Sequence, residues 1–109
     1  AFSGAGITKK GAIFSYSSNW GSPGRWGLEL MTSRYKIILR PLEKLQFQLH
    51  EDTNIYPAED IDYSLDEKYK PGLFLQVSNF LDGNTEGMLN INNHLPMVDL
   101  YYKIGSYET

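Results

Sequence analysis

The chain has no cysteine among its 109 residues, which excludes a disulfide framework and a thiolate metal site. We therefore expect a cytoplasmic protein. No apolar run approaches the length that spans a bilayer, so we expect no membrane partner. Ten basic and thirteen acidic residues give a net charge of −3 without a basic stripe, which argues against nucleic acid. There is also no initiator methionine and no signal pattern, which predicts a processed chain or a piece of a longer one.

Chemistry-bearing clusters are equally sparse. The only histidines, His50 and His94, are far apart in sequence, whereas zinc or nucleophilic chemistry normally needs a tighter constellation. The acidic residues Asp60, Asp62, Asp66 and Glu67 lack the glycine-centred loop that binds calcium, so we interpret them as a solvated acidic loop. We expect no metal site.

A glycine pattern near the N-terminus, Gly4-Ala5-Gly6 with Gly11 further on, weakly resembles a dinucleotide fingerprint. That fingerprint requires a preceding strand and a following helix, which aim backbone N–H groups at the pyrophosphate. Lys9 and Lys10 follow instead of a helix. A flexible loop is the preferred interpretation of these glycines, and we expect no cofactor site in this chain. Residues 1–10 are expected to hold either a short strand around Phe2 or the end of a longer element.

The residues from Gly11 to Leu49 carry the strongest pattern. Larger apolar side chains alternate with polar ones in four runs, as a strand with two different faces requires. Short segments with turn chemistry separate the runs, at Gly21–Gly24, Thr32–Arg34 and Arg40–Glu43. This pattern predicts a four-stranded antiparallel sheet. The runs are 12–17, 28–30, 35–39 and 45–49.

The second half of the chain adds one irregular strand and two helices. Residues 50–70 are acidic and turn-rich, and Ile55, Ile61, Tyr63 and Leu65 predict an edge strand, because Pro57 is incompatible with a central one. The apolar stripe from Gly72 to Leu81 has helical spacing. A second helix is predicted from about Leu95 to Ile104, ending near Gly105.

That second helix contains Pro96, so we expect it either to begin at about Leu95, with Asn93 or His94 near its cap, or to be kinked. Taken together, the elements predict a single α+β domain over residues 1–109. Its sheet is open and mostly antiparallel, and the two helices pack on one face.

The turn between the first two predicted strands holds the candidate binding residues. Trp20, Arg25 and Trp26, preceded by Asn19, flank the Gly-Ser-Pro-Gly turn. Indole rings stack on sugars or apolar groups, and a guanidinium pairs with carboxylate or phosphate in a forked geometry. We weigh a substrate-facing role against the alternative that both tryptophans only pack the sheet.

Three segments resemble a known family. They are SYSSNWGSPGRWGLELMTSRYKIILRPLEKLQFQ, YSLDEKYKPGLFLQVSNFLDG and the closing DLYYKIGSY. Together they are similar to the C-terminal domain of the glucose–fructose oxidoreductase / inositol dehydrogenase family (Gfo/Idh/MocA), over about Gly11 to Tyr107. The most specific parts are Ser22–Trp26, Arg40–Leu45 and Lys68–Gly72.

The resemblance implies an oxidoreductase whose preceding Rossmann domain binds NAD or NADP and supplies the catalytic lysine. No catalytic residue carries over to this chain. Glu43-Lys44 is followed by Leu45 rather than by the proline of the family's Glu-Lys-Pro motif. His94 is preceded four positions earlier by Asn90, where the family's Asp-x-x-x-His motif has aspartate.

We therefore expect the substrate-binding and oligomerisation domain of an NAD(P)-dependent oxidoreductase acting on sugars or polyols, without catalytic activity of its own. Its expected partners are the missing Rossmann domain and a second copy. The second copy would contact the sheet face that carries Ile13, Met31 and Ile38. The alternative is a stand-alone β-rich module that binds carbohydrate or a protein. The sequence does not decide which substrate or which dinucleotide is used.

Overall fold

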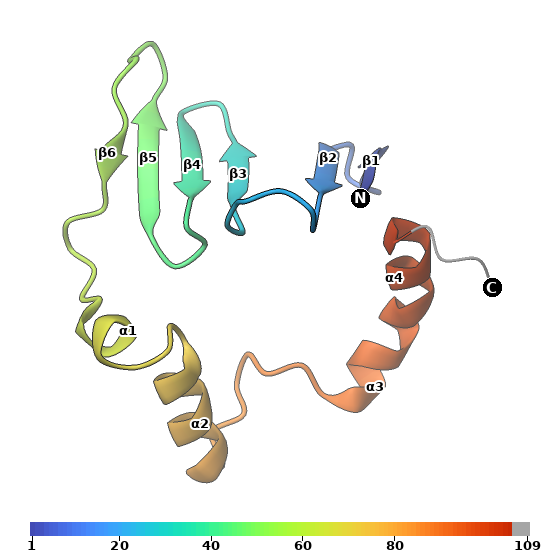
Figure 1. Cartoon of the computed structure of the whole chain (residues 1–109), viewed down its shortest axis with the longest axis vertical. Helices are drawn as coiled ribbons and strands as arrows, with labels where there is room; N and C mark the ends of the chain where they lie inside the picture. The colour runs from blue at the N-terminus through green and yellow to red at the C-terminus, as the bar shows by residue number, and fades with distance from the viewer. Residues whose placement is uncertain (106–109) are drawn as a thin grey trace. The chain divides into compact units, whose positions relative to one another are not determined.

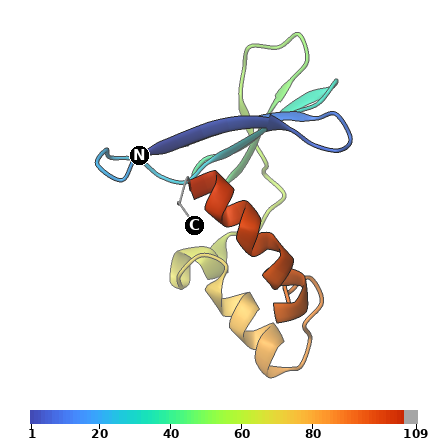
Figure 2. The ribbon, with the colours of Figure 1, turned by 90° about the vertical axis from the view of Figure 1, so that its right-hand side faces the viewer.

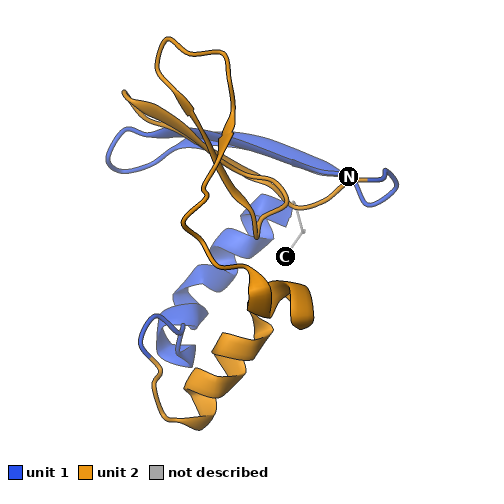
Figure 3. Ribbon diagram, turned by 90° about the vertical axis from the view of Figure 1, so that its left-hand side faces the viewer, with its two compact units in different colours: residues 1–23, 86–109 blue, residues 24–85 orange. Residues whose placement is uncertain are grey.

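The structure of the protein is a computed structural model, and it describes residues 1–105. The fold is α+β with open antiparallel sheets, as predicted (Figure 1). Two strands form one sheet and four strands form the other. The chain divides into two compact units, one of residues 1–23 and 86–109 and one of residues 24–85 (Figure 3). That residues 1–109 form a single domain stays a prediction.

The first unit begins with a hairpin. Strand β1 (Phe2–Ile7) pairs antiparallel with β2 (Ile13–Ser18) over all six residues of each strand. The Thr8 N–H donates to the Ala12 carbonyl at 2.8 Å and closes the connecting turn. The strand expected around Phe2 is confirmed. It extends over six residues, because all of them pair with residues of β2.

Two glycines of β1 lie opposite aromatic residues of β2. Gly4 faces Tyr16, and Gly6 faces Phe14. A Cβ atom at Gly6 would lie 2.6 Å from Cζ of Phe14, and one at Gly4 would collide with the Tyr16 ring. The prediction of a flexible loop at Gly4–Gly6 is therefore wrong: these glycines are strand residues that leave room for two rings.

The helical segment of this unit starts earlier than predicted. Helix α3 (Ile91–His94) is followed directly by a 3₁₀ turn, η1 (Leu95–Met97), and by α4 (Val98–Gly105). Asn90 caps α3, and its side chain accepts the Asn93 N–H at 3.0 Å. His94 is the N-terminal cap residue of η1, which begins at Leu95 as predicted, although its side chain makes no capping hydrogen bond. Pro96 is accommodated because it lies in the first turn of the 3₁₀ segment.

Helix α4 contacts β1 within the same unit (Figure 2). One hydrogen bond fixes this packing: the Tyr16 hydroxyl donates to the Ile104 carbonyl at 3.3 Å. Helix α4 reaches Gly105, the last described residue, so its predicted end near Gly105 stays a prediction. Ser106 and Tyr107, the last residues of the family resemblance, lie outside the described residues.

The second unit holds the four-stranded sheet. Strands β3 (Leu28–Met31), β4 (Tyr35–Leu39), β5 (Leu45–Leu49) and β6 (Tyr56–Pro57) follow one another as antiparallel neighbours. The predicted sheet was wrong in its first strand, because β2 pairs with β1 and β6 completes the sheet. Residues 19–27 connect β2 to β3, which is too long for the tight hairpin predicted there.

Pairing register gives this sheet two different faces, because directly opposed residues project to the same side. We name them the apolar face and the mixed face. The apolar face consists of Leu28, Leu30, Tyr35, Ile37, Leu39, Leu45, Phe47, Leu49 and Tyr56. The mixed face consists of Glu29, Met31, Lys36, Ile38, Gln46, Gln48 and Pro57.

The buried point of the sheet lies on the mixed face. Ile38 is 6% exposed, and it is the one hydrophobic residue that is buried in the described part of the chain. Its cross-strand neighbours are Glu29 and Gln46. On the apolar face, by contrast, the ends of the strands remain partly exposed, for example Leu30 in β3 and Leu49 in β5.

The helices of the second unit follow β6. The predicted irregular strand over residues 55–65 was wrong beyond Tyr56–Pro57, because Ser64–Lys68 forms helix α1. Pro57 does lie in an edge strand, as predicted. Helix α2 (Leu73–Leu81) confirms the helix predicted from Gly72 to Leu81, and it contacts α1.

Candidate functional site

The predicted binding turn spans the boundary between the two units. Asn19 and Trp20 belong to the first unit, and Arg25 and Trp26 belong to the second. Each pair is therefore described within its own unit.

Asn19 organises its own turn. Its Oδ1 accepts the Gly21 N–H at 3.0 Å, and its Nδ2 donates to the Ser22 hydroxyl at 2.8 Å. Such local side-chain bonds stabilise a turn. Asn19 also lines an open depression of about 290 Å³. The other residues around it are Ala1, Phe2, Ser3, Ser17 and Ser18.

Both tryptophans present most of their surface to solvent. Trp20 is 79% exposed and Trp26 is 73% exposed. An indole ring is large and amphipathic, and exposed rings of this kind can stack on a ligand. These exposures do not support the alternative in which both tryptophans only pack the sheet.

Arg25 points toward the loop between β4 and β5. Its Nη2 lies 3.7 Å from Oε2 of Glu43, and the two side chains are 69% and 34% exposed. A single contact of this length between exposed groups contributes little to stability. The guanidinium of Arg25 therefore keeps most of its hydrogen-bonding capacity for a ligand.

A second set of charges lies at the neighbouring strands. Glu29 in β3 accepts from Nζ of Lys36 at 2.7 Å and pairs with Nη2 of Arg40 at 3.5 Å. The Lys36 hydrogen bond is the main reason why the pKa of Glu29 lies below its ordinary value, and the positive charges of Lys36 and Arg40 add to it. Gly27 lets Arg40 lie close, because a Cβ there would be 3.0 Å from Nε of Arg40.

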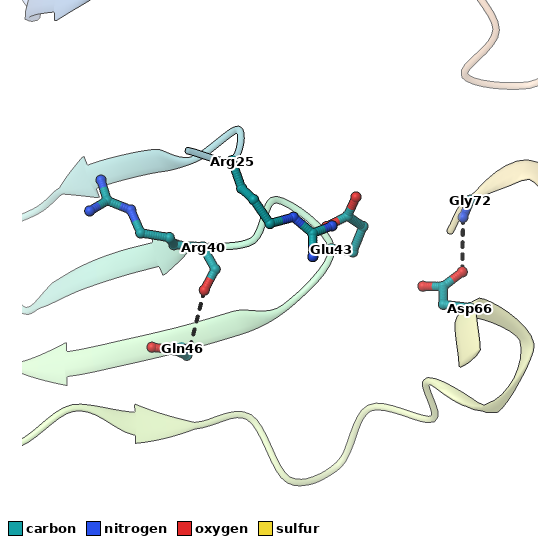
Figure 4. A network of polar contacts seen from close by, with 6 residues as sticks. All are labelled: Arg25, Arg40, Glu43, Gln46, Asp66 and Gly72. Carbon is teal, nitrogen blue, oxygen red and sulfur yellow. Dashed lines mark hydrogen bonds and ion pairs between the residues drawn. The ribbon is translucent and has the colours of Figure 1, made fainter. Parts of the chain in front are cut away.

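The two arginines do not converge. In Figure 4 the Arg25 side chain runs toward Glu43, whereas the Arg40 side chain extends the other way. The Arg40 carbonyl is also in use, as it accepts a 3.5 Å hydrogen bond from Nε2 of Gln46. A forked two-arginine clamp for one anion is therefore not formed, and Arg25 is the stronger binding candidate of the two.

Lys44 and Tyr63 connect α1 to the start of β5. The Tyr63 hydroxyl accepts the Leu45 N–H at 3.1 Å, and Nζ of Lys44 lies 3.8 Å from the centre of the Tyr63 ring. Lys44 also pairs with Glu67 at 3.7 Å. This cluster was not predicted, because Tyr63 was expected in a strand and lies instead at the start of α1.

The acidic residues between positions 60 and 67 have structural contacts. Asp62 accepts the Ser64 N–H at 2.8 Å, which lowers the pKa of Asp62. Asp66 accepts the Gly72 N–H at 2.8 Å, at the start of α2 (Figure 4). These hydrogen bonds order the two ends of α1, so the prediction of a purely solvated loop is incomplete.

A polar cluster that was not predicted lies beside β6. Asp52 accepts the Tyr56 hydroxyl at 2.7 Å and the Asn54 N–H at 2.9 Å. The backbone bond from Asn54 and the bond from Tyr56 hold the pKa of Asp52 below its ordinary value, and the same carboxylate raises the pKa of Tyr56. The spacing Asp-x-Asn-x-Tyr was its only signal.

The two histidines lie in different units. Nδ1 of His50 is 3.9 Å from Oε1 of Glu51, and Nδ1 of His94 is 3.4 Å from the Tyr101 hydroxyl. Within residues 1–105 no three His, Cys, Asp or Glu residues gather as metal ligands would. No helix in that range is long and apolar enough to cross a membrane.

The three interface candidates differ in accessibility. Ile13 is 82% exposed and Met31 is 81% exposed, so both present surface to a partner. Ile38 is 6% exposed and offers almost no area for contact. Of the two candidates in the four-stranded sheet, only Met31 is therefore exposed enough for a substitution there to test a contact with a partner.

Comparisons of the chain with protein-family models, with curated protein sequences and with solved structures gave no match.

Proposed function

We propose that this chain is the substrate-binding and oligomerisation domain of an NAD(P)-dependent oxidoreductase that acts on sugars or polyols, of the Gfo/Idh/MocA type. The observation that carries the proposal is the amount of apolar surface left open. Ile38 is the one buried hydrophobic residue in the described part of the chain, whereas large residues such as Leu28, Leu30 and Phe80 are 44–66% exposed. Contiguous exposed apolar surface usually marks an interaction site.

Two partners fit such a domain. One is a Rossmann domain, which would contribute the dinucleotide and the catalytic lysine. The other is a second copy of this chain, joined through a sheet face, since twofold dimers are the commonest closed assembly. Arg25 and Trp26 then serve as the ligand-facing residues, with the ring stacking on a sugar and the guanidinium donating to its oxygens. The lack of cysteine supports a cytoplasmic location.

The test compares this chain with the product of the full reading frame that encodes it. We expect the full product to bind NADH or NADPH and to reduce NAD⁺ or NADP⁺ by hydride transfer from a sugar or polyol, while this chain alone gives no saturable heat with NADH or NADPH. Micromolar binding of a dinucleotide by this chain alone would contradict the proposal, as would a full product without dinucleotide affinity.

The exposure of Trp20 and Trp26 favours a second candidate, a stand-alone module that binds carbohydrate. These are the only two tryptophans in the chain, so their fluorescence reports on ligands at the turn. Saccharide titrations of Trp20→Phe and Trp26→Phe variants would show which indole responds. Saturable quenching by a saccharide in this chain, together with a full product that does not bind dinucleotide, would favour the module.

A further inference from the structure

One helical segment of the first unit brings together three side chains with different donor atoms. His94 ends α3, Met97 ends η1, and Tyr101 lies in α4. The spacings of three and four residues place them on one side of the segment. All three belong to one continuous stretch of chain within residues 86–109, so the geometry of this group does not involve the second unit.

The three side chains meet at the Tyr101 hydroxyl. Its oxygen lies 3.4 Å from Nδ1 of His94, and it donates to Sδ of Met97 at 3.8 Å. The rings of His94 and Tyr101 lie beside each other, with 5.4 Å between their centres. The nitrogen and the sulfur therefore both face the same oxygen atom.

Hydrogen bonding uses these two atoms poorly. A hydroxyl carries one proton, so Tyr101 cannot donate to the nitrogen and to the sulfur at once. The 3.4 Å contact is longer than an ordinary hydrogen bond, and a thioether is a weak acceptor. Replacing the hydroxyl with a stronger partner for both atoms would therefore cost little.

Metal chemistry supplies such a partner. An imidazole nitrogen and a thioether sulfur are both neutral ligands, and the soft sulfur favours copper(I). Calcium and magnesium take oxygen ligands, carboxylates above all. Asp99 is the acidic residue nearest to Met97 in the sequence, but a step of two residues is more than half a turn of helix, so Asp99 lies on another side of the segment.

We propose that His94 and Met97 bind one copper(I) ion, with Nδ1 and Sδ as its ligands and with the Tyr101 hydroxyl displaced from between them. Bonds from a metal to imidazole nitrogen and to sulfur are about 2.0–2.3 Å long, so both side chains move inward from their present contacts. Three rotatable bonds give Met97 this freedom. The imidazole binds in its neutral form, with the lone pair of Nδ1 toward the ion. This site does not rest on the proposed oxidoreductase function.

No metal site was expected, because the two histidines are far apart in the sequence. A copper(I) site of this kind needs only one histidine, since methionine provides the other ligand. The lack of three gathered His, Cys, Asp or Glu residues within residues 1–105 does not bear on it, for the same reason.

NMR of the chain with ¹³C-labelled methionine methyl groups tests the ligands directly. The probes are silver(I) nitrate in chloride-free buffer, as a redox-stable analogue, and copper(I) kept reduced by ascorbate without oxygen. The chain has three methionines and two histidines, so Met31, Met88 and His50 serve as internal references. We expect the signals of the Met97 methyl group and the His94 ring to shift together and to saturate at one ion per chain. Equal shifts of all three methyl groups, or no shift at millimolar silver(I), would overturn the site.

Competition with a coloured copper(I) chelator measures the affinity. Met97→Leu and His94→Gln should each weaken copper(I) binding at least about tenfold, because changes even outside the ligand shell cost 10–100-fold. Met31→Leu and His50→Gln are the matched controls and should bind as the wild type does. Circular dichroism checks that each variant keeps its helices. Wild-type affinity in a folded Met97→Leu or His94→Gln variant would overturn the assignment of that ligand.

Two further measurements test the kind of ion and the role of the hydroxyl. Zinc chloride should bind at least about tenfold more weakly than copper(I), because a thioether is a soft ligand. Tyr101→Phe keeps the ring and removes the competing hydroxyl, so it should bind copper(I) at least as tightly as the wild type. Tighter binding of zinc would overturn the choice of copper(I), and weaker copper(I) binding by folded Tyr101→Phe would overturn the displacement of the hydroxyl.

Discussion

The ring of Tyr16 lies over Gly4, its direct partner across the β1–β2 hairpin, and its hydroxyl donates to the Ile104 carbonyl of α4. One side chain thus covers a strand glycine and bonds helix α4. The packing of the first unit depends on the absence of a side chain at residue 4.

Gly4→Ala should therefore destabilise the first unit. The added methyl would collide with the Tyr16 ring, and overpacking of this kind costs about 1–3 kcal/mol. Urea denaturation followed by circular dichroism measures the change. Ala5→Ser is the matched control, because Ala5 is exposed and lies on the other side of the hairpin. Equal stability of the two variants would mean that the ring does not need the glycine.

Glu29→Gln should flatten the acid limb of the pH–stability profile. The pKa of Glu29 is lowered in the folded chain, so its contribution to stability is present above the ordinary value of 4.5 and is lost as the pH falls through the folded value. Asp52 and Asp62 act in the same direction and remain in the variant. Denaturation midpoints between pH 7 and about pH 2 provide the comparison. If the denaturation midpoints of the wild type and of the variant fall in parallel as the pH decreases, the contacts of Glu29 with Lys36 and Arg40 do not stabilise the fold.

Tyr63→Phe should loosen the attachment of α1 to the sheet. The ring that faces Lys44 is kept, but the Leu45 N–H loses its acceptor, at a cost of about 1–3 kcal/mol where that group stays out of water. Hydrogen exchange of the Leu45 amide, followed by NMR, should become faster. Tyr69→Phe is the control, since Tyr69 uses its ring to stack on Phe74. An unchanged exchange rate at Leu45 would indicate that water replaces the hydroxyl.

Arg25→Ala should lower kcat/KM of the proposed full-length oxidoreductase without changing the stability of this chain. The residue is 69% exposed and has one 3.7 Å contact, so its loss should scarcely affect folding. Loss of a charged hydrogen bond to substrate would cost about 1.5–3 kcal/mol. Arg34→Ala, in the turn between β3 and β4, is the control. Unchanged kinetics for Arg25→Ala would remove this residue from the substrate site.

Local patterns in the sequence identified most elements, because alternation and helical spacing are local properties. Strands β2 to β5 and helices α2 and α4 were found in this way. The partner of each strand was harder to predict. The pairing of β1 with β2 depends on Gly4 and Gly6 fitting beneath two rings, and a glycine-containing segment has no periodicity of its own.

The candidate site was predicted less well, for the same reason. Trp20 and Trp26 were predicted to act together, but proximity in sequence did not place them in one unit. The contacts of Glu29 with Lys36 and Arg40 join residues 7 and 11 positions apart, and they form only once β3 and β4 are in register. Charge pairs of this kind follow from strand pairing, so they cannot be read before it is known.

The position of Glu29 has a further consequence for solubility. Strand β3 is an outer strand of its sheet, and Glu29 is the only charged residue in its sequence, Leu-Glu-Leu-Met. Outer strands can recruit strands from other molecules, and a charge on such a strand opposes that aggregation. The Glu29 carboxylate, which pairs with Lys36 and Arg40, thus also opposes the pairing of β3 with strands of other molecules. Protonation of this one group in acid would expose a fully apolar strand to every neighbouring molecule.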